Sequence, residues 1–251
     1  MVQSGRGHYG VMPAGQISAA SSPGWTWDPT LYAGAARHYT TGRVAYPAGV
    51  VDVLVTALDL DGTGRLLDVG CGPGSLTLAL APHFAEAIGV DADADMLGEA
   101  ARLAEEARIG NVRWMQMHVG ATTHQGVETD AALPHPQPPR HEIARLVRRY
   151  LGPVPRAGHG VLIPGTPEDE GTVYRAAGFT GPQRVEVPGW VVERTAEEIA
   201  ASVYSLSSST PHLFAERLSD FDTELRLLLG AASPDGRFSE QISPIGLYIW
   251  R

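Results

Sequence analysis

The strongest constraint on the fold is a short segment, LLDVGCGPGSLTLAL at 66–80, in which an apolar run ends in an acid and three glycines. A strand that ends in Gly-x-Gly-x-Gly and runs into a helix lets the backbone approach a ligand without side-chain clash. The helix N-terminus beyond the loop also presents free N–H groups. The segment therefore predicts a ligand-binding turn at the carboxyl end of a buried strand.

Strands and helices alternate around this turn. Apolar strands are predicted at 64–70, 87–91 and 112–119, with helices at 48–60, 75–84 and 93–108. Alternation of this kind predicts an α/β fold, in which helices sandwich a Rossmann-like parallel sheet with right-handed crossovers.

The outer parts of the chain add helices and late strands. Asp28 and Pro29 favour a short helix over 28–39, as its cap and first residue. Later segments predict helices at 141–151 and 167–177, a strand at 184–192, a helical stretch at 195–229 broken near 207–211, and a strand within 243–250. The polar, proline-rich stretch 121–140 is expected to be a loop.

Composition excludes several functional classes. The net charge is −9 and the sequence pI about 5.4, which argues against nucleic-acid binding through clustered basic residues. All 19 basic residues are arginines, so no Schiff-base or P-loop lysine exists. The single cysteine rules out an internal disulfide. The basic cluster in ARLVRRY is typical of a solvated helix face, with an acidic-ligand role as the alternative.

Residues 1–24 are rich in Gly, Ser and Pro and are expected to form a disordered tail before one domain at 25–251. The chain shows no signal-peptide h-region and no run long enough to cross a membrane. These features favour a cytoplasmic protein without membrane partners, and the oligomeric state is not indicated.

Two cofactor classes compete for the glycine loop. The nicotinamide fingerprint G-x-G-x-x-G needs a glycine where Ser75 or Thr77 stands, which weakens the dinucleotide interpretation. S-adenosylmethionine carries a sulfonium and an ammonium, and these charges suit a loop flanked by Asp68 and Asp91 in a chain without lysine.

The string LLDVGCGPGS closely resembles the first motif of class I S-adenosylmethionine-dependent methyltransferases, and AIGVDADADML supplies the acid of their second motif. The resemblance implies that the loop glycines pass under the methionyl group, that Asp68 lies near its amino group and that Asp91 binds both ribose hydroxyls. The implied cofactor-binding residues here are Asp68, Gly70, Cys71, Gly72, Gly74, Asp91, Ala92 and Met96. Met96 is equally well interpreted as core, and Cys71 as a packing residue.

An N-terminal segment, LYAGAARHYTTGRVAYP, is similar to one in the small-molecule branch of this family. It implies that Tyr39 and Arg43 close over the cofactor; the alternative is that the segment simply covers the sheet. The resemblance as a whole implies methyl transfer to a small-molecule acceptor, with the helices at 195–229 forming a lid.

The sequence departs from the family after its third strand, because the FDxV signature of a fourth strand is missing. Either 141–163 contains the fifth helix and strand, or HVGATTHQG ends a fifth strand fused to the third and a strand-helix-strand unit has been lost. The second interpretation is favoured, so the sheet is expected to lack one or two central strands. A binding protein without transfer activity is therefore an alternative function, and a nicotinamide-dependent oxidoreductase is less favoured.

No catalytic residue is assigned. His118 and His124 are expected near the cofactor face, where a histidine could act as a base, although an ordinary hydrogen-bonding role is favoured. A metal site with His135 and His141 has little support, because the chain lacks further ligands at metal-binding spacing. A hydrolase is disfavoured, since no G-x-S-x-G elbow occurs.

Overall fold

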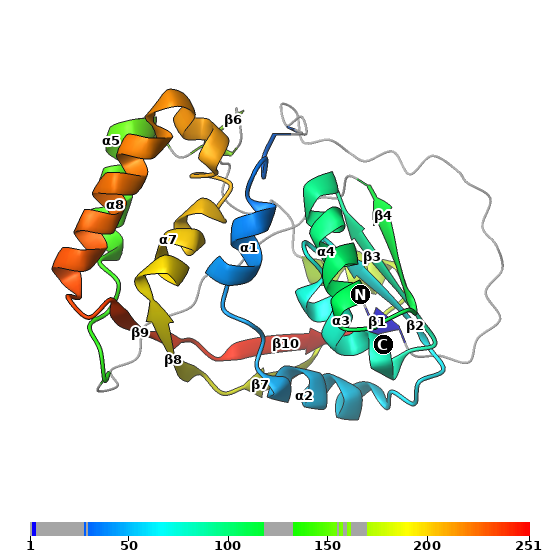
Figure 1. Ribbon diagram of the computed structural model, residues 1–251. Coiled ribbons are helices and arrows are strands. Elements are labelled where there is room, and N and C mark those ends of the chain that lie inside the picture. Colours follow the sequence, from blue (N-terminus) through cyan, green and yellow to red (C-terminus); the bar gives the residue numbers. More distant parts are fainter. Residues whose placement is uncertain are drawn as a thin grey trace.

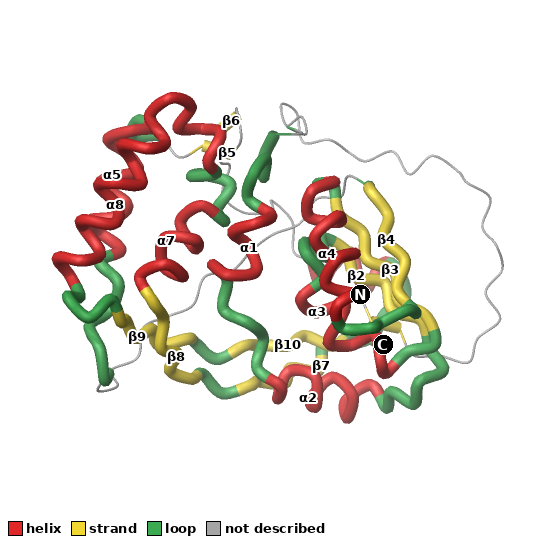
Figure 2. Tube along the Cα trace, in the orientation of Figure 1, coloured by secondary structure: helices red, strands yellow, loops and turns green. Residues whose placement is uncertain are grey.

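The structure is a computed structural model that describes residues 2–3, 28, 30–117, 133–154, 156–157, 160–161 and 170–251. Figure 1 shows a parallel sheet with its helices on one side of α1 (Ala36–Gly42) and a group of helices on the other. A long antiparallel ribbon runs beneath both parts, and Figure 2 shows the same division by secondary structure. No helix in the described ranges is long and apolar enough to cross a membrane.

The parallel sheet contains β2 (Arg65–Val69), β3 (Glu86–Asp91) and β4 (Val112–Gln116), with β3 in the centre. Asp68 pairs with Gly89 and Asp91 with Gln116, so the carboxyl ends of the strands meet at one edge. The short strand β1 (Val2–Gln3) lies antiparallel against the free edge of β2. The Rossmann-like α/β fold predicted from the sequence is confirmed for these three strands and their crossover helices.

Three helices pack on the sheet near its apolar core. They are α2 (Ala48–Leu58), α3 (Ser75–Leu80), which continues as the 3-10 turn η1 (Ala81–His83), and α4 (Ala94–Glu106). Val50, Leu54, Leu66, Leu80 and Phe84 are nearly fully buried together, which follows the apolar spacing of the helices and the alternation in β2. Side chains on the opposite sheet face remain 39–46% exposed, namely Leu67, Val69 and Met115.

The place beside β2 bears on the two interpretations of the missing strands. Within the described residues, β3 pairs with one edge of β2 and β1 with the other, and no parallel strand lies at the edge that β1 occupies. The described residues of the segment suggested as a fifth strand form β5 (Arg156–Ala157) and β6 (Gly160–Val161), which pair with each other outside the parallel sheet. The alternative segment, HVGATTHQG, lies outside the described residues.

One predicted strand is in fact two, and this is a correction. The stretch expected as a strand at 184–192 divides into β7 (Gln183–Val187) and β8 (Trp190–Thr195). Pro188 and Gly189 separate them, because proline lacks the N–H that a ladder needs. β7 pairs with β10 (Ile245–Ile249) and β8 with β9 (Arg237–Ile242), an unpredicted strand. Together these four strands form the ribbon in Figure 1.

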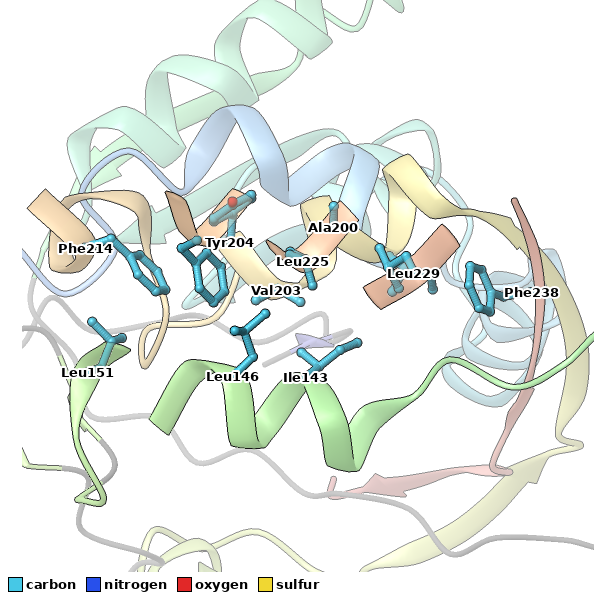
Figure 3. Close-up of a cluster of buried hydrophobic side chains, with 12 residues drawn as sticks. Ile143, Leu146, Leu151, Ala200, Val203, Tyr204, Phe214, Leu225, Leu229 and Phe238 are labelled. Atoms are coloured by element: carbon cyan, nitrogen blue, oxygen red, sulfur yellow. The ribbon is translucent and has the colours of Figure 1, made fainter. Parts of the chain in front are cut away.

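The second group of helices has an apolar core of its own. It consists of α5 (Arg140–Leu151), α7 (Ala196–Tyr204), the 3-10 segment η2 (Pro211–Arg217) and α8 (Leu218–Ala232). Figure 3 shows Ile143, Leu146 and Leu151 of α5 pointing toward side chains of α7 and α8. We call these helices the helical unit; α6 (Glu170–Ala176) lies outside it.

Helix α1 begins later than predicted, which is a second correction. The sequence favoured a helix over 28–39 with Asp28 as its cap, but α1 starts at Ala36. Gly34 has φ +74°, a left-handed conformation that interrupts a helix, and Asp28 Oδ1 instead accepts the N–H and hydroxyl of Thr30 in a turn. Helix α1 packs against α7 on one side and α4 on the other, so it joins the two parts of the molecule.

Candidate active site

The glycine loop follows β2 as predicted, and its backbone conformation requires glycine. Gly70, Gly72 and Gly74 have φ of +75°, +55° and +79°, a region that residues with a Cβ enter only with strain. The N–H groups of Gly70 and Cys71 both donate to Val90 O of β3, at 2.7 and 3.0 Å. Gly74 then provides the left-handed residue before α3.

The three glycines have different neighbours. A Cβ on Gly74 would lie 2.7 Å from Trp114 Cη2, so this glycine is needed for packing against the Trp114 ring as well as for its φ. A Cβ on Gly72 would meet nothing closer than Tyr39 Cζ at 4.0 Å. Space therefore remains above Gly72, and this is the point of the loop that a ligand could approach.

Asp91 ends β3 and holds the loop in place. Its Oδ2 accepts the Gly72 N–H at 2.8 Å and its Oδ1 accepts the Asp93 N–H at 2.9 Å. A carboxylate has about four acceptor positions, so these two bonds leave room for ligand hydroxyls. Asp93 caps α4 through the Met96 N–H, and burial raises the pKa of its carboxyl.

Asp68 lies one residue before the end of β2 and is also oriented. Its Oδ2 accepts the hydroxyl of Thr77, a fully buried residue of α3, at 2.6 Å. Across the sheet edge, Gln116 Nε2 donates to the Ala92 carbonyl at 3.0 Å and so fixes the turn after β3. Two carboxylates on adjacent strands thus flank the glycine loop, which makes its surroundings suited to a cation.

Cys71 belongs to the packing of the loop. Its side chain is 8% exposed, and its Sγ would be 3.0 Å from a Cβ on Gly89. Burial, followed by the charges of Asp68 and Asp91, raises the pKa of the thiol to about 12. The thiol therefore stays protonated at neutral pH and does not have the character of a nucleophile.

Helix α1 brings two further predicted residues to the loop. The ring of Tyr39 faces Gly72, and the Arg43 guanidinium carbon lies 5.0 Å from the centre of that ring. Met96, at 2% exposure, is buried against Ala35 and Ala36. This burial supports the core interpretation of Met96, while Tyr39 and Arg43 cover the glycine loop.

Two residues of the candidate site, Tyr32 and Ser207, were not predicted from the sequence. Tyr32 is half-buried beside Tyr39, and its pKa is raised by burial first and then by the charges of Tyr39 and Asp91. Ser207, in the turn after α7, lies close enough to Tyr32 to oppose part of that rise in pKa, and the Ser205 carbonyl accepts from Arg43 Nη2 at 3.4 Å. No local pattern marks these residues, because they meet only through the packing of α1 on α7.

The candidate histidines that the structure describes, His135 and His141, do not lie at this site. His118 and His124 fall outside the described residues. His135 approaches Glu193 at 3.8 Å and Asp235 at 3.6 Å near β8 and β9, and His141 lies on α5. In the part of the chain that the structure describes, no group of three His, Cys, Asp or Glu side chains is arranged to hold a metal ion.

The geometry around the glycine loop fits a positively charged cofactor. The free space over Gly72, the two carboxylates and an aromatic ring suit a ligand with hydroxyl groups and positive charge. S-adenosylmethionine, which carries ribose hydroxyls, a sulfonium and an ammonium, meets these requirements. A pyrophosphate would instead face two negative side chains, which disfavours a dinucleotide.

Comparison with known proteins gives a family for part of the chain. Residues 66–153 match the family model described as "Methyltransferase domain", which includes the glycine loop and Asp91. The uncharacterized methyltransferase YcgJ of Bacillus subtilis is 32% identical over 81 residues, which is 32% of each chain. A trans-aconitate 2-methyltransferase of Pseudomonas paraeruginosa is 43% identical over 79 residues, 31% of this chain and 26% of the relative.

The matched region thus spans about a third or less of these curated relatives. Among solved structures, that of the YcgJ protein aligns over 80% of this chain and 97% of its own, with 16% identity and a TM-score of 0.40.

Proposed function

We propose that this chain, whose residues 66–153 match a methyltransferase domain, is a class I S-adenosylmethionine-dependent methyltransferase that binds this cofactor at the glycine loop and transfers its methyl group to a small-molecule acceptor. The family uses S-adenosylmethionine as methyl donor. The observation that carries the proposal is the Asp91 carboxylate, which is bonded to the Gly72 N–H and lies at the carboxyl edge of the parallel sheet.

In this proposal each residue has a defined role. Asp91 accepts the ribose hydroxyls, Asp68 holds the ammonium group, and Gly70, Gly72 and Gly74 let the cofactor lie close to the backbone. Tyr39 and Arg43 cover it and exclude water, with Cys71, Ala92 and Met96 packing beneath. Methyl transfer is an in-line displacement on an activated carbon, so positioning and exclusion of water are the main contributions expected from the protein.

A small-molecule acceptor is supported by two observations. The net charge of −9 is unfavourable for a polyanionic acceptor such as RNA. The partial relatives named trans-aconitate 2-methyltransferase act, by their name, on a small organic acid. We further propose that the helical unit, including 195–229, serves as a lid over the acceptor, since α7 reaches the site through Ser205 and α1.

A second candidate function is cofactor binding without transfer. It is favoured by the sheet, in which the edge of β2 opposite β3 carries only the short antiparallel strand β1 within the described residues. In this family the strand after β2 in the sheet lines the methyl group and the acceptor, so its absence would remove the usual place for a base.

Calorimetry with S-adenosylhomocysteine tests cofactor binding. We expect S-adenosylhomocysteine to bind the wild-type protein, and NAD to bind it much more weakly. Asp91→Asn should weaken it by about ten- to a hundredfold, because hydrogen bonds to a charged group contribute about 1.5–3 kcal/mol. Asp95→Asn, in the exposed first turn of α4, is the matched control and should change affinity little. Tight NAD binding, or equal effects of the two variants, would contradict the proposal.

A turnover assay then separates the two candidates. Formation of S-adenosylhomocysteine is measured over a panel of small organic acids, alcohols and amines. Product formation that depends on Asp91 supports the enzyme, whereas binding without turnover on every acceptor supports the inactive binder.

A further inference from the structure

A cavity of about 330 Å³ lies between α5 and α7 in the helical unit, and the glycine loop does not line it. Its size falls in the range of sites that hold small organic ligands. Most of its walls are apolar: they include Ile143, Val147 and Leu151 from α5 and Ile199, Val203 and Leu206 from α7 and the turn after it. Such walls suit a hydrocarbon or aromatic body.

The arginines of the ARLVRRY segment differ in their partners. Arg145 pairs with Glu142 and Arg149 with Glu224. Arg148, which lines the cavity, has neither an ion pair nor a side-chain hydrogen bond with any residue in the described ranges. A guanidinium with five donors and no acceptor nearby is suited to a carboxylate.

The other polar side chains of the cavity, apart from the Ser208 hydroxyl, are already engaged. Arg140 Nη2 bonds Glu240 Oε1, while the hydroxyls of Ser202 and Ser209 donate to the carbonyls of Ile199 and Val203. One guanidinium is therefore available, and this favours a single negative charge over a polyanion. Val154 and Leu206, 53% and 41% exposed, extend the apolar surface at this site.

We propose that this cavity binds an apolar monocarboxylate, with its hydrocarbon body between α5 and α7 and its carboxylate on Arg148. The residues after α7 connect this site to the glycine loop. Leu206, Ser208 and Ser209 line the cavity, whereas the carbonyl of Ser205, in the same turn, accepts from Arg43 beside the glycine loop. The coupling rests on the proposed function: through this shared turn, a ligand in the cavity changes the affinity for the cofactor, and the cofactor changes the affinity for that ligand by the same factor.

Titration of the full chain with octanoate, and with octanol as its neutral counterpart, tests the site. We expect octanoate to bind more tightly than octanol, and Arg148→Ala to weaken octanoate about tenfold or more while leaving octanol nearly unchanged. Arg145→Ala, on the same helix but paired with Glu142, is the control and should bind as the wild type does. Equal binding of the two probes, or equal effects of the two variants, would overturn the proposal.

A second variant tests the location. Ala144 is exposed and lines the cavity, so Ala144→Trp should fill it and abolish octanoate binding, with an unchanged unfolding transition as evidence that the chain still folds. Undiminished binding would place the probe elsewhere and refute the site.

Calorimetry with S-adenosylhomocysteine in the presence and absence of octanoate tests the coupling. A change in affinity of severalfold that disappears in Arg148→Ala supports it, and independent binding refutes it. If octanoate binds through Arg148 and S-adenosylhomocysteine does not bind, the proposed function fails while the carboxylate site stands.

Discussion

At the scale of single residues, the glycine motif combines two requirements that look alike in sequence. Gly74 is fixed by its positive φ and by the Trp114 ring 2.7 Å from where a Cβ would lie. Gly72 has the same handedness but faces open space below Tyr39. A motif typical of cofactor binding therefore includes one glycine that backbone conformation and packing both require and one that is also placed to meet a ligand.

These roles predict different outcomes for Gly74→Ala and Gly72→Ala. Gly74→Ala should lower the free energy of unfolding by about 1–3 kcal/mol more than Gly72→Ala does. Both variants have strained backbone, but only the alanine at position 74 would also clash with the Trp114 ring. Gly72→Ala should mainly weaken S-adenosylhomocysteine binding. Urea unfolding and calorimetry measure the two effects.

A double-mutant cycle checks the cause. In a Trp114→Ala background the extra destabilisation by Gly74→Ala should largely disappear, because the ring atoms it meets are gone. If the cost is the same with and without Trp114, the clash is not its origin.

At the scale of elements, α1 is the connection on which the site depends. It carries Tyr39 and Arg43, and at its last residue it comes very close to α7: a Cβ on Gly42 would lie 2.4 Å from the carbonyl carbon of Ala201. Arg194 Nη2 also donates to the Gly42 carbonyl at 2.7 Å. The sequence shows only an unremarkable TTG at this point, and nothing local predicts the contact.

Gly42→Ala should therefore destabilise the protein by about 1–3 kcal/mol through overpacking, and loosen the α1–α7 contact. Urea unfolding and limited proteolysis of the N-terminal half measure this. Gly49→Ala is the matched control, because Gly49 is also helical but its nearest outside atom, Val187 Cγ1, would be 3.7 Å away. That variant should be neutral or more stable by about 0.5–1 kcal/mol, from the better helix propensity of alanine. Equal losses in both variants would contradict the packing argument.

At the scale of the whole molecule, one buried ion pair joins segments distant in sequence. Arg194 of β8 and Glu240 of β9 are each 7% exposed and pair at 2.9 Å. Arg194 also donates to the carbonyls of Gly42 and Glu198, and Glu240 accepts from Arg140 of α5. Burial lowers the pKa of Arg194, so its partners are needed to keep its charge stable inside the protein.

Glu240→Ala should cost about 3–5 kcal/mol of unfolding free energy, because it leaves the buried Arg194 charge without its carboxylate. The exposed pair Arg184–Glu186 provides a comparison, and Glu186→Ala should cost no more than about 1 kcal/mol. Urea unfolding of both variants tests this. Where Glu240→Ala fails to fold, Glu240→Gln should still be clearly less stable than wild type; a loss as small as that of Glu186→Ala would contradict the expectation.

Local patterns predicted much of the sheet side of the molecule. Strands β2, β3 and β4 and helices α2 and α4 follow from apolar periodicity, and the position of Asp91 follows from a motif confined to residues 66–96. The division of the predicted strand 184–192 at Pro188 and Gly189 was missed, although a proline indicates such a break. The reason is that the apolar and polar residues on its two sides alternate as they would in one continuous strand. Strand β9 was missed because three of its residues, Ser239, Glu240 and Gln241, are polar, so the segment lacks the apolar pattern of a buried strand.

The sequence by itself determined the class of fold, the match of residues 66–153 to a methyltransferase domain and the acidic, glycine-rich character of the loop, because these depend on residues that are neighbours along the chain. Only the tertiary structure decided that α1 covers the loop, that Tyr32 and Ser207 meet near Asp91, and that Arg148 alone in its cluster faces a cavity without a described partner. The physical reason is that packing between distant segments fixes which polar groups are paired and where space remains, and no local pattern records those contacts.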